Sequence, residues 1–293
     1  MSNFTTIIKN QKSMKTSYSV RKMKRFRFYI FALTVFFITG AWTIYQTNHP
    51  TIYVIGDSTV KNGQGKGDGG LWGWGKFLPD YFDTARIIVE NDAMGGTSSR
   101  TFQTKGLWNK VLAKIKPGDF VIMQFGHNDG GPLADSARAR GTIKGIGSES
   151  QEIYNPILKK QEVVYTYGYY IRKFIAHTRE KGATPIICSP IPRNDWRNGK
   201  IIADSSSYTV WAGQVAKAES VMFINLNEII VKHYTELGEE KVRTTLFTNK
   251  DHTHTTEAGA KLNAACVIEG IKALKDCPLN KYLLPAAGEI GKK

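Results

Sequence analysis

Thr51-Ile-Tyr-Val-Ile-Gly-Asp-Ser-Thr-Val60 is the stretch around which the rest of the chain can be understood. Its first five residues are β-branched or aromatic, which is typical of a buried strand. Gly56 lets the backbone turn sharply, so Asp57 and Ser58 come directly after the carboxyl end of that strand. Ligands of open α/β sheets bind at this end, and Ser58 is therefore a candidate nucleophile. The Gly-Asp-Ser sequence alone does not show that Ser58 is a nucleophile, because Asp57 or Ser58 could equally cap a helix.

Four later runs of β-branched and apolar residues predict further strands, and segments with helical spacing lie between them. Val163, Tyr167 and Ile171 illustrate that spacing. Strands that alternate with helices form a parallel sheet covered on both faces, which places the chain in the α/β class. The five strands are predicted at residues 51–55, 86–90, 120–125, 184–189 and 221–226. Helices are predicted to begin within residues 72–78, to span 163–175 and 208–218, and to follow Thr255 or Thr256.

The first fifty residues differ in kind from the rest of the chain. They hold eight basic residues and no acidic one, and residues 28–45 form an uncharged, mostly apolar run. A basic segment followed by an apolar one is typical of an export signal, and this run is nearly as long as the ~20 residues that span a bilayer. We expect residues 1–50 to be a leader, either a signal peptide or an N-terminal membrane anchor. Residues 51–293 are then expected to be a single exported domain, periplasmic, extracellular or membrane-anchored.

Charge and cysteine content limit the classes of function. The net charge is +15, but the leader holds eight of the 40 Lys and Arg residues, which leaves 32 basic against 25 acidic residues. The remainder has no dense basic run with interleaved aromatics, so nucleic-acid binding is not indicated. Cys188 lies in an apolar run and is expected to be a buried thiol. Cys266 and Cys277 could pair in an oxidising compartment, and no pair of cysteines has metal-ligand spacing.

Polar loops follow the first three predicted strands, and another precedes the last helix. In the second loop, Gly95 and Gly96 allow backbone amides to approach a ligand closely. Residues 126–131 read Gly-His-Asn-Asp-Gly-Gly, and residues 249–254 read Asn-Lys-Asp-His-Thr-His. Residues 132–160 form a long polar insertion, and connections of that length are usually functional or disordered.

A serine hydroxyl needs a base to remove its proton, and that base needs a third group to orient it. Asp251 can reach one ring nitrogen of His254 while the other nitrogen faces Ser58. His252 and His127 compete for the role of base. His252 is adjacent to Asp251 and is expected to diverge, and His127 could be structural. A metal site made of Asp251, His252 and His254 is the next alternative, although its spacing matches no known zinc signature.

Donors for an oxyanion can also be assigned, because the transition state of ester cleavage carries one. The candidates are the backbone N–H groups of Ser58 and Gly96 and the side-chain amide of Asn128. They follow the first, second and third strands, which a doubly wound sheet can bring to one edge.

A glycine-rich loop after the serine imitates a dinucleotide-binding fingerprint. It reads Gly65-x-Gly67-x-x-Gly70, with Glu90 twenty residues after the last glycine. Such glycines act when they directly follow the strand and open a helix, whereas residues 57–64 intervene here. We therefore do not expect a dinucleotide cofactor.

The motifs, taken in order, resemble the four blocks of the SGNH (GDSL-type) hydrolases. These are Gly56-Asp-Ser58, Gly96, Gly126-His-Asn128 and Asp251-x-x-His254. More narrowly, residues 56–59, 91–98, 125–131 and 251–255 are similar to those of rhamnogalacturonan acetylesterases, and the likeness runs from about residue 51 to about residue 276.

The resemblance implies a flavodoxin-like three-layer α/β/α sandwich with a five-stranded parallel sheet. It also implies a metal-independent serine esterase, without a cofactor, that removes acetyl groups from pectic polysaccharide. Ser58 would be the nucleophile, His254 the base and Asp251 its partner. Ser58, Gly96 and Asn128 would form the oxyanion hole. We expect a monomer.

Two other functions on the same fold stay open. One is a different SGNH esterase, lipase or thioesterase, which a wide apolar acyl groove would reveal. The other is a non-catalytic carbohydrate-binding protein. Basic residues of the insertion and the next helix could attract a polyanion or simply form a solvated surface. They are Arg138, Arg140, Lys144, Lys159, Lys160, Arg172 and Lys173.

Overall fold

The computed structural model describes residues 49–203 and 207–285. The predicted leader lies outside the described residues, apart from His49 and Pro50. Among the described helices, none combines the length and the apolar character needed to cross a membrane.

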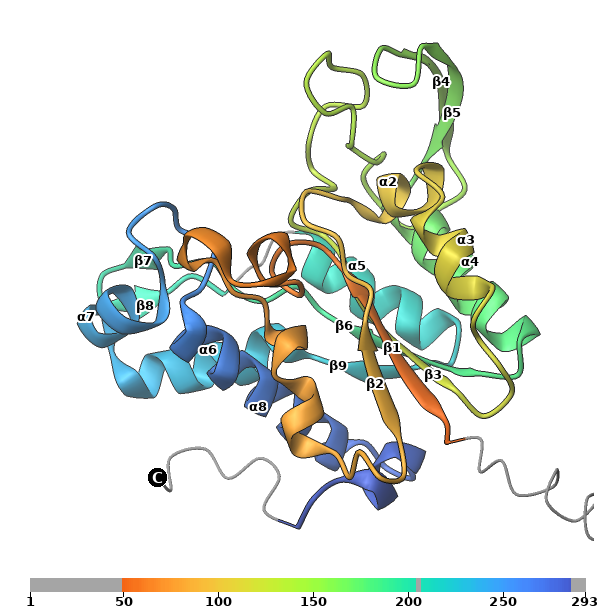
Figure 1. The fold of residues 1–293 in the computed structure, drawn as a ribbon. Helices are drawn as coiled ribbons and strands as arrows, with labels where there is room; N and C mark the ends of the chain where they lie inside the picture. The colour runs from red at the N-terminus through yellow and green to blue at the C-terminus, as the bar shows by residue number, and fades with distance from the viewer. Residues whose placement is uncertain (1–48, 204–206, 286–293) are drawn as a thin grey trace, which may run out of the picture. The chain divides into compact units, whose positions relative to one another are not determined.

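A five-stranded parallel sheet forms the centre of the fold, in the order β2-β1-β3-β6-β9 (Figure 1). This strand order is the flavodoxin-like one, so the predicted fold class is confirmed. β1 lies between β2 and β3, with Tyr53 opposite Glu90 on one side and Val121 on the other. The strands are β1 (Thr51–Gly56), β2 (Ile88–Asn91), β3 (Phe120–Gln124), β6 (Thr184–Cys188) and β9 (Met222–Ile224).

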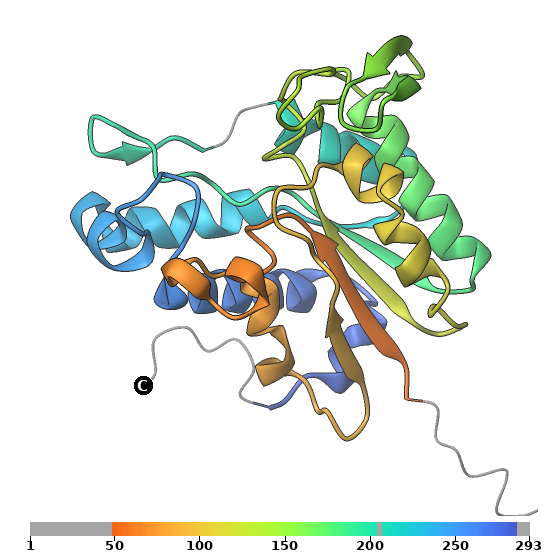
Figure 2. The same cartoon turned by 45° about the horizontal axis from the view of Figure 1, so that its top comes forward.

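Helices cover both faces of the sheet, which makes three layers (Figures 1 and 2). Alternation along β1 shows why: Ile52 and Val54 join one buried cluster, while Tyr53 and Ile55 join the other. The first cluster includes residues of α6 (Leu226–Leu237) and α8 (Glu257–Ala273). The second includes residues of α2 (Ser99–Thr104), α3 (Leu107–Leu112), α4 (Tyr167–Glu180) and α5 (Ser207–Ala218).

The helix expected to begin within residues 72–78 is present only as short 3-10 segments. Two short 3-10 helices, Trp74–Lys76 and Leu78–Tyr81, occupy this segment. Close packing is the reason, because a Cβ atom at Gly73 would lie 2.3 Å from the carbonyl carbon of Val60. The segment packs against the serine turn and does not form a separate α-helix. The backbone N–H of Trp74 donates to the carbonyl of Thr59 at 3.1 Å.

The insertion at residues 132–160 contains a strand that the sequence analysis did not predict. β4 (Ser150–Asn155) pairs with β5 (Lys160–Tyr165) as an antiparallel hairpin above α2 (Figure 1). Val163 was assigned to the following helix but lies in β5, with 39% of its surface exposed. α4 begins only after Thr166, whose side chain accepts a hydrogen bond from the N–H of Tyr169 and so caps the helix.

All three cysteines are buried free thiols, so Cys266 and Cys277 do not pair. Burial raises the pKa of Cys277 above its ordinary value, which keeps this thiol protonated at neutral pH. The last predicted helix is capped by Thr256, whose hydroxyl accepts from the N–H of Gly259 at 3.2 Å.

Candidate active site

The turn that carries Ser58 is held by a chain of buried polar side chains. Asp57 accepts hydrogen bonds from the backbone N–H and the hydroxyl of Thr59, both at 2.8 Å. Asp57 therefore caps this turn and no helix. The hydroxyl of Thr59 accepts in turn from Gln124 at 2.6 Å, and Gln124 accepts from the indole of Trp74 at 2.9 Å. Buried polar groups that are bonded in sequence are costly to disturb, so Ser58 has a fixed position at the carboxyl end of β1.

Ser58, His254 and Asp251 lie in one line of hydrogen bonds. Nε2 of His254 is 2.8 Å from Oγ of Ser58, and Nδ1 of His254 is 2.7 Å from Oδ2 of Asp251. Asp251 also accepts from the backbone N–H groups of Thr253 at 2.7 Å and His254 at 2.8 Å. These bonds fold residues 251–254 into a tight turn, which explains how two residues only three apart face each other.

The charge of Asp251 determines the tautomer of His254. Burial alone would raise the pKa of this carboxyl, but the hydrogen bonds from the ring and N–H of His254 and from the N–H of Thr253 outweigh it and lower the pKa to about 2. Asp251 is thus ionised at neutral pH and can only accept hydrogen bonds. Nδ1 of neutral His254 must then carry the proton. Nε2 is left with a lone pair directed at the hydroxyl of Ser58.

Of the two competing histidines, His252 is bonded to other residues, whereas His127 shares the cleft with Ser58. Nδ1 of His252 lies 2.7 Å from Oδ1 of Asp195, and its Nε2 lies 3.3 Å from Nη1 of Arg193. His252 thus diverges from Asp251, and the three residues considered as a metal site do not converge. His127 lines the cleft beside Ser58, but the ring bonded to the serine hydroxyl is that of His254.

Three potential oxyanion donors lie along the same cleft, which Ser58, Gly96 and Asn128 line together. Gly96 has φ +76°, a left-handed conformation that favours glycine. Within the described backbone, no hydrogen bond uses the N–H of Ser58 or of Gly96. The amide of Asn128 donates one hydrogen to the carbonyl of Thr97 at 2.8 Å, which orients it and leaves a second hydrogen for a ligand.

The cleft has a volume of about 630 Å³, and its charged side chains are all basic. Only two of the seven basic residues singled out in the sequence, Arg138 and Arg140, line it. The sequence analysis missed Lys105 and Arg193. Arg193 follows β6 by five residues. Ligands bind beyond the carboxyl ends of the strands, and this strand-end rule, which identified Ser58, could also have found Arg193.

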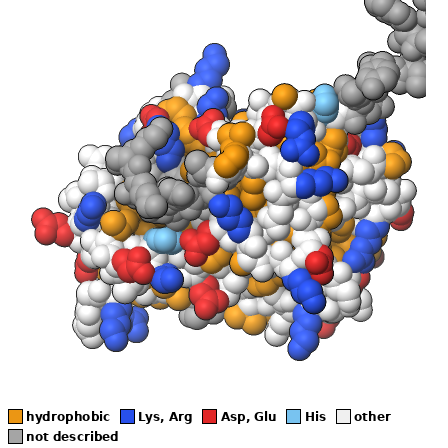
Figure 3. Space-filling view, turned by 90° about the horizontal axis from the view of Figure 1, so that it is seen from below, with side chains coloured by type: hydrophobic (Ala, Val, Ile, Leu, Met, Phe, Trp, Pro, Cys, Tyr) orange, Lys and Arg blue, Asp and Glu red, His pale blue; other side chains and the backbone are white. Residues whose placement is uncertain are grey.

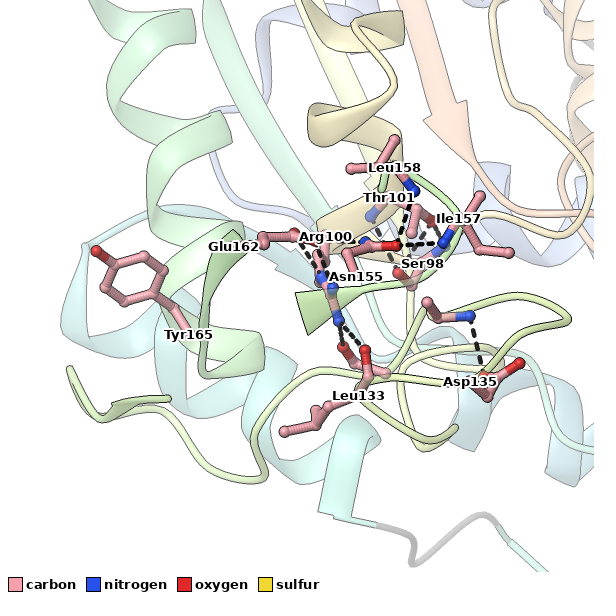
Figure 4. Close-up of polar contacts among 12 residues, drawn as sticks. Ser98, Arg100, Thr101, Leu133, Asp135, Asn155, Ile157, Leu158, Glu162 and Tyr165 are labelled. Carbon is pink, nitrogen blue, oxygen red and sulfur yellow. Dashed lines mark hydrogen bonds and ion pairs between the residues drawn. The ribbon is translucent and has the colours of Figure 1, made fainter. Parts of the chain in front are cut away.

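A buried arginine fixes the wall that carries Arg138 and Arg140. The side chain of Arg100, on α2, is fully buried and binds both carboxylate oxygens of Glu162 at 2.7 and 2.8 Å (Figure 4). Its remaining nitrogen donates to the carbonyls of Leu133 at 2.9 Å and Gly141 at 2.8 Å. A bidentate arginine is directionally rigid, so Arg100 ties α2, the loop of residues 133–141 and β5 together.

Asp129, in the loop after β3, is fully buried next to the site. Its Oδ1 accepts from the N–H of Ser99 at 3.1 Å and from the Ser99 hydroxyl at 2.5 Å, whereas Oδ2 has no partner among the described residues. Burial is the main cause that raises the pKa of Asp129 to about 7, and the bonds from Ser99 only partly oppose it. The group is therefore largely protonated in mildly acidic solution.

This raised pKa predicts a distinctive pH dependence of stability. Between about pH 4 and pH 7 the folded chain keeps a proton on Asp129 that the unfolded chain has released, so this group makes the folded state less stable as pH rises. Asp129→Asn should remove that contribution. The free energy of unfolding of the variant, minus that of the wild type, should increase by on the order of a few kcal/mol from pH 5 to pH 8 in urea titrations. A difference that stays constant with pH would contradict the assignment.

Comparison with known proteins identifies the family of the chain. The sequence model of the family described as GDSL-like Lipase/Acylhydrolase matches residues 52–267. The chain is 36% identical over 243 residues to the probable rhamnogalacturonan acetylesterase YesY of Bacillus subtilis, a match that covers 82% of this chain and 99% of that protein. It is 29% identical to the rhamnogalacturonan acetylesterase of Emericella nidulans, over 75% of this chain and 84% of the relative.

Solved structures show the same fold. The crystal structure of YxiM from Bacillus subtilis superposes with a TM-score of 0.62 at 28% identity, over 77% of this chain and 56% of that one. Since the family model covers well over half of the chain, the chain belongs to the GDSL-like lipase/acylhydrolase (SGNH hydrolase) family and is a carboxylic ester hydrolase.

Proposed function

We propose that this protein removes O-acetyl groups from pectic polysaccharide, with rhamnogalacturonan as the substrate, through an acetyl-enzyme intermediate on Ser58. The observation that carries the mechanism is the continuous hydrogen-bonded line from Ser58 through His254 to Asp251. The names of the relatives support the substrate class, since one is a rhamnogalacturonan acetylesterase and another a probable rhamnogalacturonan acetylesterase.

In the first half of the reaction, Oγ of Ser58 attacks the acetyl carbonyl while Nε2 of His254 takes the hydroxyl proton. The negative charge that develops on the carbonyl oxygen is stabilised by the N–H groups of Ser58 and Gly96 and by the amide of Asn128. Asp251 stabilises the imidazolium. Collapse of the intermediate breaks the bond to the sugar oxygen, which receives the proton from His254.

In the second half, a water molecule attacks the acetyl group on Ser58, and His254 takes its proton. The same donors stabilise the second oxyanion. Release of the serine oxygen, protonated by His254, yields acetate and the free enzyme. The balance requires only the ester and water.

The lining of the site favours a short acyl group on a polar alcohol. Among the described lining residues, Leu71 is the apolar side chain along the main cleft, and Met94 is the one in the adjoining pocket that also contains Ser58. A lipase would need a wide apolar groove for a long chain, which these two side chains do not provide. The basic leader predicted at residues 1–50 fits this proposal, because an exported enzyme would meet plant polysaccharide outside the cell.

Acetate release tests the proposal directly. The protein should release acetate from acetylated rhamnogalacturonan with a kcat/KM at least tenfold above that for acetylated xylan or for a long-chain p-nitrophenyl ester. Preference for the long-chain ester would favour a lipase. A preference for acetylxylan would overturn the pectic substrate while leaving the serine mechanism in place.

A further inference from the structure

The charge of the described side chains along the cleft is of one sign, unlike that of the face seen from below. Among the described residues, those that line the cleft include no Asp or Glu, whereas the face of the molecule seen from below shows acidic and basic side chains side by side (Figure 3). A concave site with charges of one sign attracts and concentrates ligands of the opposite sign. The basic side chains that line the cleft are Lys105, Arg138, Arg140 and Arg193.

Arg193 is held in place on one side of the cleft. Its Nη1 donates to the hydroxyl of Thr253, in the same turn as His254, and its Nη2 lies 3.4 Å from the carbonyl oxygen of His127. Nη1 also lies 3.3 Å from Nε2 of His252. A guanidinium can only donate, so Nε2 of His252 must accept this hydrogen bond. The ring that accepts it is neutral and carries its proton on Nδ1.

Asp195 explains why His252 can act as that acceptor. Oδ1 of Asp195 lies 2.7 Å from Nδ1 of His252, so the carboxylate fixes the proton on Nδ1 and directs the Nε2 lone pair at Arg193. The chain thus contains a second Asp–His pair that faces a guanidinium where the first faces a serine. This arrangement is suited to hold Arg193 in position. His252 would then have a role that is separate from the reaction at Ser58.

Arg138 and Arg140 lie along the same cleft, on the loop that Arg100 anchors. Nη1 of Arg140 donates to the carbonyl of Gly96 at 3.2 Å, next to the proposed oxyanion hole. Asp135 accepts from the backbone N–H of Arg138 at 2.6 Å and shapes the turn. Burial and the charge of Arg138 both lower the pKa of Arg140, so the two like charges repel each other. An anionic ligand between them would relieve that repulsion.

We propose that Arg193, Arg138 and Arg140 form a subsite for the carboxylate of a uronic acid residue in the same saccharide chain as the acetylated sugar. His252 and Asp195 position Arg193. The guanidinium fork suits a planar carboxylate, which it can bind through two parallel hydrogen bonds. This inference rests on the proposed function and deepens it, since it names the part of the substrate that is recognised beside the ester.

A pair of substrates that differ only in charge tests the subsite. One is an acetylated rhamnose–galacturonate oligosaccharide with free carboxyl groups, and the other is the same compound with each carboxyl converted to the neutral primary amide. The wild-type protein should release acetate from the carboxylate form with a kcat/KM about tenfold higher than from the amide form, as charge-assisted hydrogen bonds predict. The difference should lie in KM and decrease with added salt.

Variants identify the residues that cause the difference between the carboxylate and amide substrates. Arg193→Gln should bring the ratio of the two kcat/KM values close to one, and His252→Ala should lower it by a similar factor. The double variant should lower it no further, because the two residues act through one guanidinium. Arg179→Gln removes a positive charge at the exposed end of α4, outside the cleft, and should keep the wild-type ratio. Thermal melting of each variant verifies that it is folded.

The outcomes separate the two proposals. If the wild type releases acetate equally well from both oligosaccharides, or if Arg193→Gln keeps the wild-type ratio, the carboxylate subsite is overturned and the acetylesterase remains. If the wild type hydrolyses a small acetyl ester but neither oligosaccharide, the polysaccharide substrate fails, and the subsite fails with it.

Discussion

Ser58→Ala is expected to lower kcat for acetyl ester hydrolysis by roughly 10⁴- to 10⁶-fold without unfolding the protein. The substitution removes the atom that would form the acetyl-enzyme, and residues that act as a unit lose nearly all of their effect when one is removed. The remaining rate would come from the oxyanion donors and from substrate binding. Steady-state release of acetate from a small ester measures the loss. The wild type is diluted until its rate falls in the same range as that of the variant.

The fold should tolerate this change. The turn is held by Asp57, Thr59 and Gln124, none of whose hydrogen bonds involves the hydroxyl of Ser58. Ser150→Ala, at an exposed position of β4, provides a matched control and should keep wild-type activity. The serine mechanism would have to be abandoned if a folded Ser58→Ala protein retained activity within tenfold of the wild type.

The strand-end rule accounts for most of what the sequence revealed about the site. Ser58, Gly96 and Asn128 lie far apart in the chain, yet each follows a strand of one parallel sheet. Local chemistry predicted the rest, since Asp251 and His254 are close enough in sequence for a single turn to join them. The alternating pattern of a strand and the polar residues that directly follow it are local properties, so they can be read from a sequence.

Contacts between distant, non-repeating segments could not be predicted in the same way. Arg100 and Glu162 are 62 residues apart, and nothing in either neighbourhood marks them as partners. The hairpin of β4 and β5 was missed because its side chains are mostly exposed and give no strong alternation. Val163 fitted a helical spacing by coincidence, and the cap at Thr166 determines where the helix begins.

The presence of two Asp–His pairs sharpens the remaining prediction, which concerns Asp251. Asp251→Asn should keep the shape of the turn, because its side-chain oxygen can still accept from the N–H groups of Thr253 and His254. The side-chain amide, however, would face Nδ1 of His254 as a donor. The histidine would then carry its proton on Nε2, where it cannot accept the proton of Ser58.

We therefore expect Asp251→Asn to reduce kcat for a small neutral acetyl ester by roughly 10³- to 10⁴-fold, which is less than the loss expected for Ser58→Ala. Asp195→Asn makes the same change in the other Asp–His pair and should cost less than about tenfold on that ester, because His252 does not contact Ser58. Measuring both variants from pH 5 to pH 9 separates a wrong tautomer from a simple shift of the histidine pKa. A tautomer effect persists across the range. Loss of the carboxylate's charge alone would instead favour the neutral ring, so recovery of the Asp251→Asn rate relative to the wild type toward low pH would show that this carboxylate acts only through its charge.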